Sequence, residues 1–212
     1  MEDLLSTRTL IMLVAPTAMG KSTIMNAAVE LDHRFARVRS FTTRPHRSND
    51  EAGQYIYLSD TELVRERSDG TVVTETTFPS TGYTYGTLYT SYAGDYCLLD
   101  TLANSVAEYR ALPFRRTLTV SLSASADNWC AWFVSRYPER SDMAVKRLEE
   151  AELSIAWSLE DTETTWLVND GTPEEVAAKL VGLTRDTVPS DPQGPEYARQ
   201  VLERIRSGVI WP

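Results

Sequence analysis

Three consecutive residues, Gly20, Lys21 and Ser22, have the types and the order that phosphate binding requires. They follow an apolar run, residues 10–14, which has the length and composition of a buried strand, and they open a segment with helical character. In a loop that joins a strand to a helix, backbone N–H groups can surround a β-phosphate, and the positive end of the helix dipole adds to the attraction. In such a site, Lys21 would reach the β- and γ-phosphates, and the Ser22 hydroxyl would bind Mg²⁺.

This stretch therefore predicts a binding site for a nucleoside triphosphate. The alternative is a strand-to-helix turn that carries Gly-Lys-Ser by coincidence, and the flanking strand and helix patterns argue against it. Ala15 stands where the motif usually has its first glycine, which a loop tolerates if that position does not need a positive φ. The residues expected around the phosphates are Ala15, Pro16, Thr17, Ala18, Met19, Gly20, Lys21, Ser22 and Thr23.

A second candidate site lies in residues 40–47, which read Ser-Phe-Thr-Thr-Arg-Pro-His-Arg. Arg44 and Arg47 can each recognise a phosphate through paired hydrogen bonds, and Ser40 can add one more. Pro45 stiffens the turn between the two arginines. The alternative is a solvated basic loop, but the phosphate loop upstream favours a second phosphate site.

The composition of the 212-residue chain is that of an ordinary globular protein, with 42% apolar and 24% charged residues. A net charge of -9 argues against a general surface for DNA, RNA or anionic membranes. Cys97 and Cys130 lie far apart in apolar surroundings, so we expect buried free thiols rather than a disulfide or a zinc site. The sequence shows neither a secretory signal nor an apolar stretch of membrane-spanning length, so we expect a cytoplasmic protein with no membrane partner.

Strands that alternate with helices predict an α/β fold with a parallel sheet covered on both faces. Residues 36–92 are rich in Thr, Tyr and Gly and are expected to form a small β-rich lobe, inserted into a core of residues 1–35 and 93–212. The tail, residues 186–212, is rich in proline and ends in a helix, and its Trp211 either packs on the core or contacts a partner. Core strands are expected over residues 10–14, 96–99, 117–122 and 166–168, and a further strand over residues 35–41 at the start of the lobe. Helices are expected to begin near residues 21, 59, 103, 128, 142, 173 and 197.

The order of these motifs resembles that of the guanylate kinase family, from about residue 10 to about residue 183. The resemblance implies a three-layer α/β/α core of the P-loop NTPase type, a monophosphate-binding lobe, and a lid at about residues 136–147. The motifs that carry it are the phosphate loop, Thr-Thr-Arg-Pro-His-Arg at residues 42–47, Gly53 with Tyr55 and Tyr57, Tyr-Gly-Thr at residues 85–87, Leu-Leu-Asp at residues 98–100, Arg136 with Arg147, and Val-Asn-Asp at residues 168–170.

The resemblance also implies roles for individual residues. Arg136 and Arg147 would clamp the transferring phosphoryl group beside Lys21, and Asn169 would lie near the adenine of ATP. These roles make physical sense, because phosphoryl transfer needs positioning and charge neutralisation more than covalent chemistry. The residues expected to bind the acceptor are Ser40, Arg44, Arg47, Tyr55 and Tyr85 at its phosphate, Glu75 and Thr87 at its base, and Asp100, which serves the magnesium shell or holds an arginine of the lobe.

The sequence departs from the family pattern at the residues that read guanine. The family uses a Glu before the Tyr-Gly stretch and the second Asp of a Leu-Asp-x-Asp strand end. Glu75 lies near the first position, but the segment from Glu75 to Tyr85 is one residue longer, and Leu102 stands at the second position. The spacing to Tyr55 is one residue shorter than usual. Loss of a carboxylate that accepts from guanine would reduce base selectivity more than phosphate binding.

The expected function is the transfer of a phosphoryl group from ATP, with Mg²⁺, to a nucleoside monophosphate, with GMP or dGMP the first choice. One alternative is a kinase of the same fold that acts on a modified nucleotide or a sugar phosphate. A second alternative is a binding module that has kept the fold and lost catalysis, against which Lys21 and Ser22 argue, because such a module needs no donor nucleotide. The expected assembly is a monomer or a homodimer, with no DNA or RNA polymer as partner.

Overall fold

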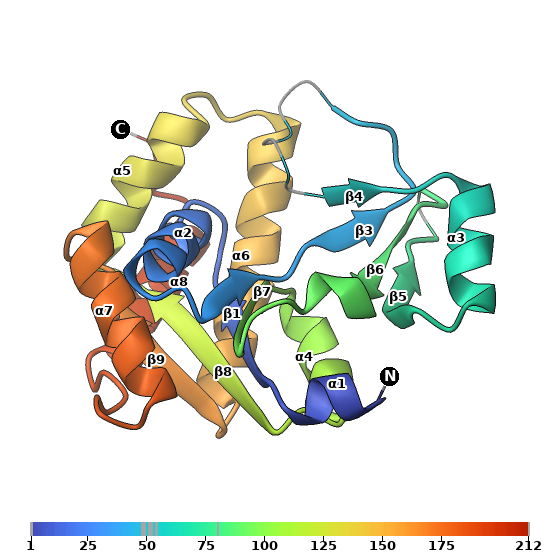
Figure 1. The fold of residues 1–212 in the computed structure, drawn as a ribbon. Helices are drawn as coiled ribbons and strands as arrows, with labels where there is room; N and C mark the ends of the chain where they lie inside the picture. Colours follow the sequence, from blue (N-terminus) through green and yellow to red (C-terminus); the bar gives the residue numbers. More distant parts are fainter. Residues whose placement is uncertain (1, 48–49, 51–52, 54, 80, 212) are drawn as a thin grey trace.

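The computed structural model describes residues 2–47, 50, 53, 55–79 and 81–211, and a five-stranded parallel sheet forms its centre (Figure 1). The strand order is β2-β7-β1-β8-β9. The predicted α/β fold with a parallel sheet is confirmed. The strands are β1 (Thr9–Val14), β2 (Phe35–Arg37), β7 (Tyr96–Asp100), β8 (Arg116–Ser123) and β9 (Thr164–Val168).

Helices cover both faces of this sheet, because its central strands are apolar on both faces. Every residue of β1 is buried, and successive side chains point to opposite sides. Ile11 and Leu13 pack in the core that contains α2 (Lys21–Leu31) and α7 (Pro173–Thr184). Leu10 and Met12 pack in the opposite core, with α1 (Glu2–Ser6) and α4 (Val106–Arg110). The predicted three-layer arrangement is therefore confirmed.

The remaining core helices lie near the β8–β9 side of the sheet, where α8 (Gly194–Ser207) contacts both strands. The same helix packs against α5 (Ala126–Arg136) and α6 (Asp142–Glu160). Cys97 of β7 and Cys130 of α5 are buried and free, as expected. None of the helices in the described part of the chain combines the length and hydrophobicity needed to cross a membrane.

Several helices begin at a side chain that caps their first turn. Ser59 precedes α3 (Asp60–Ser68), Ser125 precedes α5 and Thr172 precedes α7, and each hydroxyl accepts a hydrogen bond from a backbone N–H of the first turn. These starts agree with the predicted ones to within about two residues. The helix expected from residue 103 is divided into a short 3₁₀ helix, η2 (Ala103–Ser105), and α4, and α1 has no counterpart among the expected elements.

A second, four-stranded sheet lies to one side of the core, with strand order β4-β3-β6-β5 (Figure 1). Its outer face packs against α3 through Phe41, Leu63 and Leu88. The chain returns to the core through a short 3₁₀ helix, η1 (Tyr89–Ser91). The strands of this lobe are β3 (Ser40–Thr42), β4 (Tyr55–Tyr57), β5 (Val72–Thr77) and β6 (Thr84–Leu88).

The strand expected over residues 35–41 is in fact two strands that belong to different sheets. β2 pairs with β7 of the core, and β3 pairs with β4 and β6 of the lobe. The expected lobe boundary at residue 36 was therefore wrong by a few residues, since it falls inside β2. Val38 is the last residue held to the core sheet, because its N–H donates to the Leu98 carbonyl oxygen at 2.8 Å.

The tail after α7 folds back onto the core. The Asp191 N–H donates to the Trp166 carbonyl oxygen at 2.9 Å, and the Trp166 N–H donates to Ser190 Oγ at 2.9 Å. Residues 190–191 thereby satisfy backbone groups at the outer edge of β9, an edge that would otherwise invite pairing with another chain.

Trp211 packs on the core, which was one of the two environments expected for it, the other being contact with a partner. Its Nε1–H donates to the Tyr137 carbonyl oxygen at 2.9 Å, and its ring meets the Phe133 ring edge-on with centroids 6.0 Å apart. The tail is thus anchored to the short link between α5 and α6.

We expect Trp211→Ala to lower the free energy of unfolding by about 1–3 kcal/mol, because it removes a packed ring and leaves the Tyr137 carbonyl without its donor. Urea unfolding followed by circular dichroism measures this loss. Trp132 on α5 provides a matched control, since 36% of it is exposed. Trp132→Ala should cost clearly less, and equal losses for the two variants would contradict the anchoring role.

Candidate active site

The phosphate loop joins β1 to α2 and has an unusual backbone at two positions. Gly20 adopts φ 87° and Ala18 adopts φ 65°. At Gly20 a side chain is doubly excluded, because an added Cβ would also lie 2.7 Å from Asn169 Nδ2. Ala15 is not among the described residues with a positive φ, so its place at the first motif position causes no backbone strain. The strain lies instead at Ala18, in the middle of the loop.

Two side chains from distant elements hold this loop in shape. Asn169, just after β9, donates through Nδ2 to the Met19 carbonyl oxygen at 2.8 Å. Trp129, buried in α5, donates through Nε1 to the Thr17 carbonyl oxygen at 3.0 Å. The loop is therefore preorganised, and its carbonyl groups are drawn toward the core. Asn169 contacts the phosphate loop itself, which adds a structural role to the expected one near adenine.

Lys21 lies at the start of α2 with its ammonium group directed to the loop and to β7. Its Nζ donates to the Ala15 carbonyl oxygen at 2.6 Å and lies 3.7 Å from Asp100 Oδ1. The parallel register explains this contact, because it pairs Leu13, next to the loop, with Asp100 at the end of β7. The carboxyl ends of β1 and β7 thus bring a cation and a carboxylate together at one edge of the sheet.

The residues at this edge fit a magnesium nucleotide. Ser22 and Thr23 occupy the first turn of α2, where backbone N–H groups without helical partners and the helix dipole favour anions. Among the described residues there is no group of three or more His, Cys, Asp and Glu side chains that could hold a metal ion. A Mg²⁺ ion at Ser22 would thus depend mainly on phosphate oxygens, as is usual for this ion.

Arg44 of the second candidate site is buried and paired. Its two terminal nitrogens donate to the two carboxylate oxygens of Asp50 at 2.7 and 2.6 Å. Nη1 also donates to the Pro45 carbonyl oxygen at 3.0 Å. The guanidinium lies beside two tyrosine rings, with its central carbon 5.0 Å from the Tyr55 centroid and 5.8 Å from the Tyr57 centroid. By contrast, Arg47 is exposed.

One face of the lobe sheet carries an aromatic row. The pairing of β3 with β4 and β6 puts Ser40, Tyr55, Tyr57 and Tyr85 on the same face, opposite to the face that packs on α3. Tyr55 meets both Tyr57 and Tyr85 edge-on, with each pair of centroids 6.1 Å apart. Phe78 extends the row from Tyr85, at 5.4 Å.

One residue of the row, Tyr55, is within reach of the charge of Asp100 at the end of β7. Burial raises the pKa of Tyr55, the charge of Arg44 opposes this shift, and the charges of Tyr85 and Asp100 add to it. Asp100 therefore acts on Tyr55 of the lobe and also lies beside Lys21 of the core. Of the predicted site residues, the structure brings together the phosphate loop, Asp100, Tyr55, Tyr85 and Arg44.

Glu75 does not join this group. In the β5–β6 pairing Glu75 lies opposite Gly86, whereas Thr76 lies opposite Tyr85. Glu75 is consequently on the α3 face, where its carboxylate pairs with Arg67 Nη2 at 2.8 Å. The reason is the irregularity in β5 between Val72 and Thr74 together with the longer connection, since a shift of one residue turns a strand side chain to the opposite face. The placement of Glu75 beside Thr87 at an acceptor base is therefore corrected.

Thr87 is on the same face as Tyr85 but is completely buried. Its hydroxyl oxygen lies 2.9 Å from Thr74 Oγ1 and 2.8 Å from the Tyr92 hydroxyl. Tyr109 shares a hydrogen bond with Thr74 at 3.0 Å and completes a buried network of hydroxyls. The Thr87 hydroxyl is thus engaged inside the protein, which differs from its expected contact with a base.

Leu102 is exposed at the site, just beyond β7. Fifty-five per cent of the residue is accessible. It stands two positions after Asp100, where the family pattern has its second aspartate. With Glu75 turned away, neither expected position presents a carboxylate beside the aromatic row.

The two arginines expected in a lid lie on either side of the short link between α5 and α6. Arg136 ends α5 and places its guanidinium 5.9 Å from the Tyr137 centroid. Burial lowers the pKa of Arg147 on α6, but the hydrogen bond and charge of Glu150, with smaller contributions from Tyr137, outweigh it and raise the pKa overall. The rest of the link, residues 138–141, is exposed.

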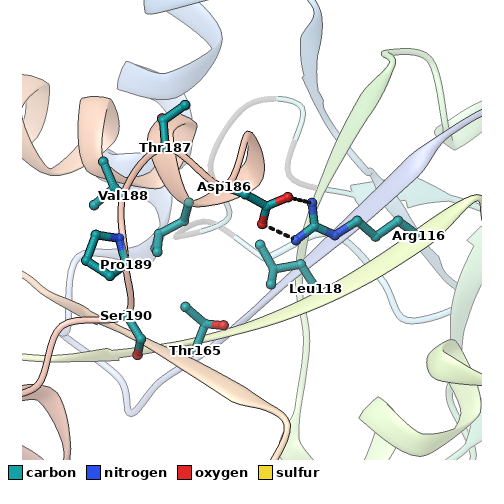
Figure 2. Close-up of a pocket in the computed structure, with 9 residues that line it drawn as sticks. Arg116, Leu118, Thr165, Asp186, Thr187, Val188, Pro189 and Ser190 are labelled. Carbon is teal, nitrogen blue, oxygen red and sulfur yellow. Dashed lines mark hydrogen bonds and ion pairs between the residues drawn. The ribbon is translucent and has the colours of Figure 1, made fainter.

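A separate cavity of about 390 Å³ lies away from these residues (Figure 2). It is lined at the start of β8 by Arg116 and Leu118 and in the tail by residues 186–190. Arg116 and Asp186 form a two-fold hydrogen-bonded ion pair on its wall, at 2.9 and 2.7 Å. Because the amino ends of the parallel strands form this region, the cavity and the phosphate loop are at opposite ends of the sheet, and no predicted site residue lines it.

Sequence reasoning missed Asp50 and Trp129 as parts of the site. Asp50 is only six residues from Arg44 in the sequence, and this short separation could have suggested an ion pair. Acidic residues in such loops are usually solvated, however, so nothing in the sequence favoured the pair. In the sequence, Trp129 indicated only that it belongs to the buried face of a helix. Its contact with Thr17 joins residues far apart in the sequence, which no local pattern reports.

Comparison with known proteins agrees with this arrangement. The sequence model described as guanylate kinase matches residues 6–182. The fold is similar to the crystal structure of guanylate kinase from Anaplasma phagocytophilum, with 16% identity over 86% of each chain and a TM-score of 0.53. A gluconokinase from Sinorhizobium meliloti 1021 matches with 12% identity over 86% of this chain and 94% of that chain, with a TM-score of 0.44. The family match spans the phosphate loop, the lobe and the α5–α6 link, and the chain belongs to the guanylate kinase family.

Proposed function

We propose that this chain is an ATP- and Mg²⁺-dependent nucleoside-monophosphate kinase. The observation that carries the proposal is the combination of two candidate phosphate sites: a phosphate loop whose Lys21 lies 3.7 Å from Asp100, and a lobe whose buried Arg44 lies beside Tyr55 and Tyr57. Transfer between two bound phosphates requires one site for each.

In the proposed reaction, the chain's residues position and neutralise rather than react. The loop N–H groups and Lys21 would hold the β- and γ-phosphates of ATP, and Arg136 and Arg147 would neutralise the charge on the transferring group. Ser22 would hold Mg²⁺, which would supply positive charge to offset that of the phosphates. We propose that the α5–α6 link closes over the donor as a lid and excludes water.

Ser40, Arg47 and the Arg44–tyrosine cluster are the proposed binding site for the acceptor's phosphate. GMP and dGMP are the first choice of acceptor, because the family relationship supports a nucleotide. Base discrimination is proposed to be weak, since guanine offers N–H donors and neither Leu102 nor Thr76 provides a carboxylate for them. A modified nucleotide or a sugar phosphate is the alternative acceptor that this neutral surface favours.

The test is a coupled ADP-release assay on a panel of nucleoside monophosphates and sugar phosphates. We expect GMP and dGMP to be phosphorylated, with kcat/KM less than about a hundredfold above that of other monophosphates. Leu102→Asp should raise the preference for guanine, by about tenfold, because a carboxylate then accepts from the base.

A matched control is Leu153→Asp, since Leu153 is an exposed leucine on α6 outside the proposed site. This variant should leave base preference unchanged. Activity on a sugar phosphate alone would replace the proposed acceptor, and ATP binding without turnover of any acceptor would favour a binding module.

A further inference from the structure

Asp50 is the most heavily hydrogen-bonded side chain of the second candidate site. Its carboxylate accepts four hydrogen bonds: two from Arg44 at 2.7 and 2.6 Å, one from the Arg47 backbone N–H at 2.7 Å and one from the Tyr57 hydroxyl at 2.6 Å. Only 7% of its side chain is exposed, and only 5% of that of Arg44. One carboxylate thus joins both arginine positions and a tyrosine of the lobe.

The geometry of Arg44 fixes which of its donors are used. A guanidinium has five N–H donors in a planar fork. Nη1 gives its two to Asp50 and to the Pro45 carbonyl oxygen, and Nη2 gives one to Asp50. Among hydrogen bonds to described residues, this leaves Nε–H and the second Nη2–H, which lie side by side on one edge. Such an edge is the geometry that binds a phosphate with two parallel hydrogen bonds.

The hydroxyl of Tyr55, another expected phosphate ligand, lies beside Arg44. Its pKa is raised by burial, while the charge of Arg44 acts in the opposite direction. The uncommitted edge of Arg44 and the Tyr55 hydroxyl therefore share one location on the aromatic face. Without Asp50, the Arg44 guanidinium would keep only the Pro45 carbonyl and could turn about its side-chain torsions.

We propose that Asp50 is the positioning residue of the acceptor-phosphate site: it fixes the terminal edge of Arg44 and the backbone of Arg47, so that the other edge of Arg44 receives the phosphate. Asp50 does not touch the acceptor itself. This inference rests on the proposed function, because it assigns Asp50 to the acceptor half of that site.

The pair also remains charged at the pH of any assay. The hydrogen bonds from Arg44 hold the pKa of Asp50 well below its usual range, burial acts against this, and Tyr57 and the Arg47 N–H add to it. The same pairing holds the pKa of Arg44 above its ordinary value, against the effect of burial. Loss of the carboxylate charge by substitution is therefore the way to test its role.

The test is Asp50→Asn, which keeps the shape of the side chain but removes its charge and one acceptor oxygen. We expect the KM for the acceptor to rise by about ten- to a hundredfold, while the KM for ATP stays the same and kcat changes less than about threefold. Tyr57→Phe, which removes one of the four hydrogen bonds to Asp50, should raise the acceptor KM by a few-fold. It also keeps the test valid if Asp50→Asn fails to fold.

The chain offers a matched control in Arg110 and Asp161. This pair has the same geometry, with terminal nitrogens 2.8 and 2.7 Å from the two carboxylate oxygens, and joins α4 to the end of α6. Asp161→Asn should lower the melting temperature without a change in acceptor KM. If the acceptor KM rises in proportion to the fall in melting temperature in both Asp50→Asn and Asp161→Asn, the positioning role of Asp50 is overturned.

A double-mutant cycle separates positioning from direct contact. If Asp50 acts mainly through Arg44, then Asp50→Asn should change the acceptor KM by only about two- to threefold in an Arg44→Ala background, the part that acts through the Arg47 backbone. An undiminished effect there, or an unchanged KM in the single variant, would overturn the inference.

The proposed function fails in a different way, namely when the wild type phosphorylates no nucleoside monophosphate. If the wild type instead accepts a sugar phosphate, the same double-mutant cycle is run with that acceptor. A wild type that phosphorylates no acceptor overturns both the proposed function and the role of Asp50.

Discussion

Replacement of Lys21 by alanine should reduce kcat by at least about a hundred- to a thousandfold and leave the fold intact. The side chain works on phosphate charge, and its described contacts are the Ala15 carbonyl oxygen at 2.6 Å and the Asp100 carboxylate at 3.7 Å. Asp100 is half-exposed and can be solvated by water when its partner is lost. The loop keeps its shape through Asn169 and Trp129, which do not depend on the lysine.

The measurement is steady-state ADP release, with thermal melting of each variant. Lys179→Ala is a matched control, because Lys179 is an exposed lysine on α7, and this variant should retain full activity. A Lys21→Ala enzyme that turns over normally would remove the phosphate-loop interpretation. A melting temperature far below that of wild type would mean that the lysine serves the fold rather than the donor.

The features that sequence alone predicted well are those that local pattern determines. The apolar run before the phosphate loop and the caps at Ser125 and Thr172 are local, and the corresponding strand and helices are present. The alternation of strands and helices sufficed for the parallel sheet, because parallel strands need helical crossovers.

The features that sequence alone missed depend on partners distant in the chain. The run from Phe35 to Phe41 has one periodicity, but its first half pairs with β7 and its second half with β4 and β6. No pattern within the run says which neighbours it has. Trp211 had two possible environments for the same reason, and the choice came from its hydrogen bond to Tyr137.

Glu75 shows how small the decisive difference can be. Its distance from Tyr85 along the chain is one residue more than the family pattern has, and an irregularity in β5 lies just before it. Since strand side chains alternate between faces, that difference moves the carboxylate from the aromatic face to Arg67 on α3. The residues of the two proposed phosphate sites lie mostly in continuous loops, so motif order places them, but it does not place residues that come from opposite strands.

The two arginines of the second site should respond very differently to the same substitution. Arg47→Ala removes an exposed guanidinium while its backbone N–H still donates to Asp50 at 2.7 Å. We expect the KM for the acceptor to rise by about ten- to a hundredfold, from the loss of charge-assisted hydrogen bonds, with an unchanged melting temperature and an unchanged KM for ATP.

Arg44→Ala should cause a similar or larger loss of acceptor binding together with a large loss of stability. It leaves the buried Asp50 carboxylate without its principal partner, which is among the most costly single changes in a folded protein. A fall in melting temperature on the order of 10 °C at pH 7 is expected. Thermal melting and acceptor kinetics on both variants test the contrast, and equal melting temperatures for the two would contradict it.

The difference in stability between wild type and Arg44→Ala should depend on pH in a defined direction. In the wild type, Arg44 holds the pKa of Asp50 below its unfolded value, so the stabilisation is present above the unfolded pKa and is lost as the pH falls toward the folded one. In Arg44→Ala, the buried carboxylate lacks that partner, and protonation relieves its desolvation. The difference in melting temperature between wild type and Arg44→Ala should therefore narrow as the pH is lowered from 7 toward 4, whereas a constant or widening difference would show that the charge of Asp50 is not the source of the loss.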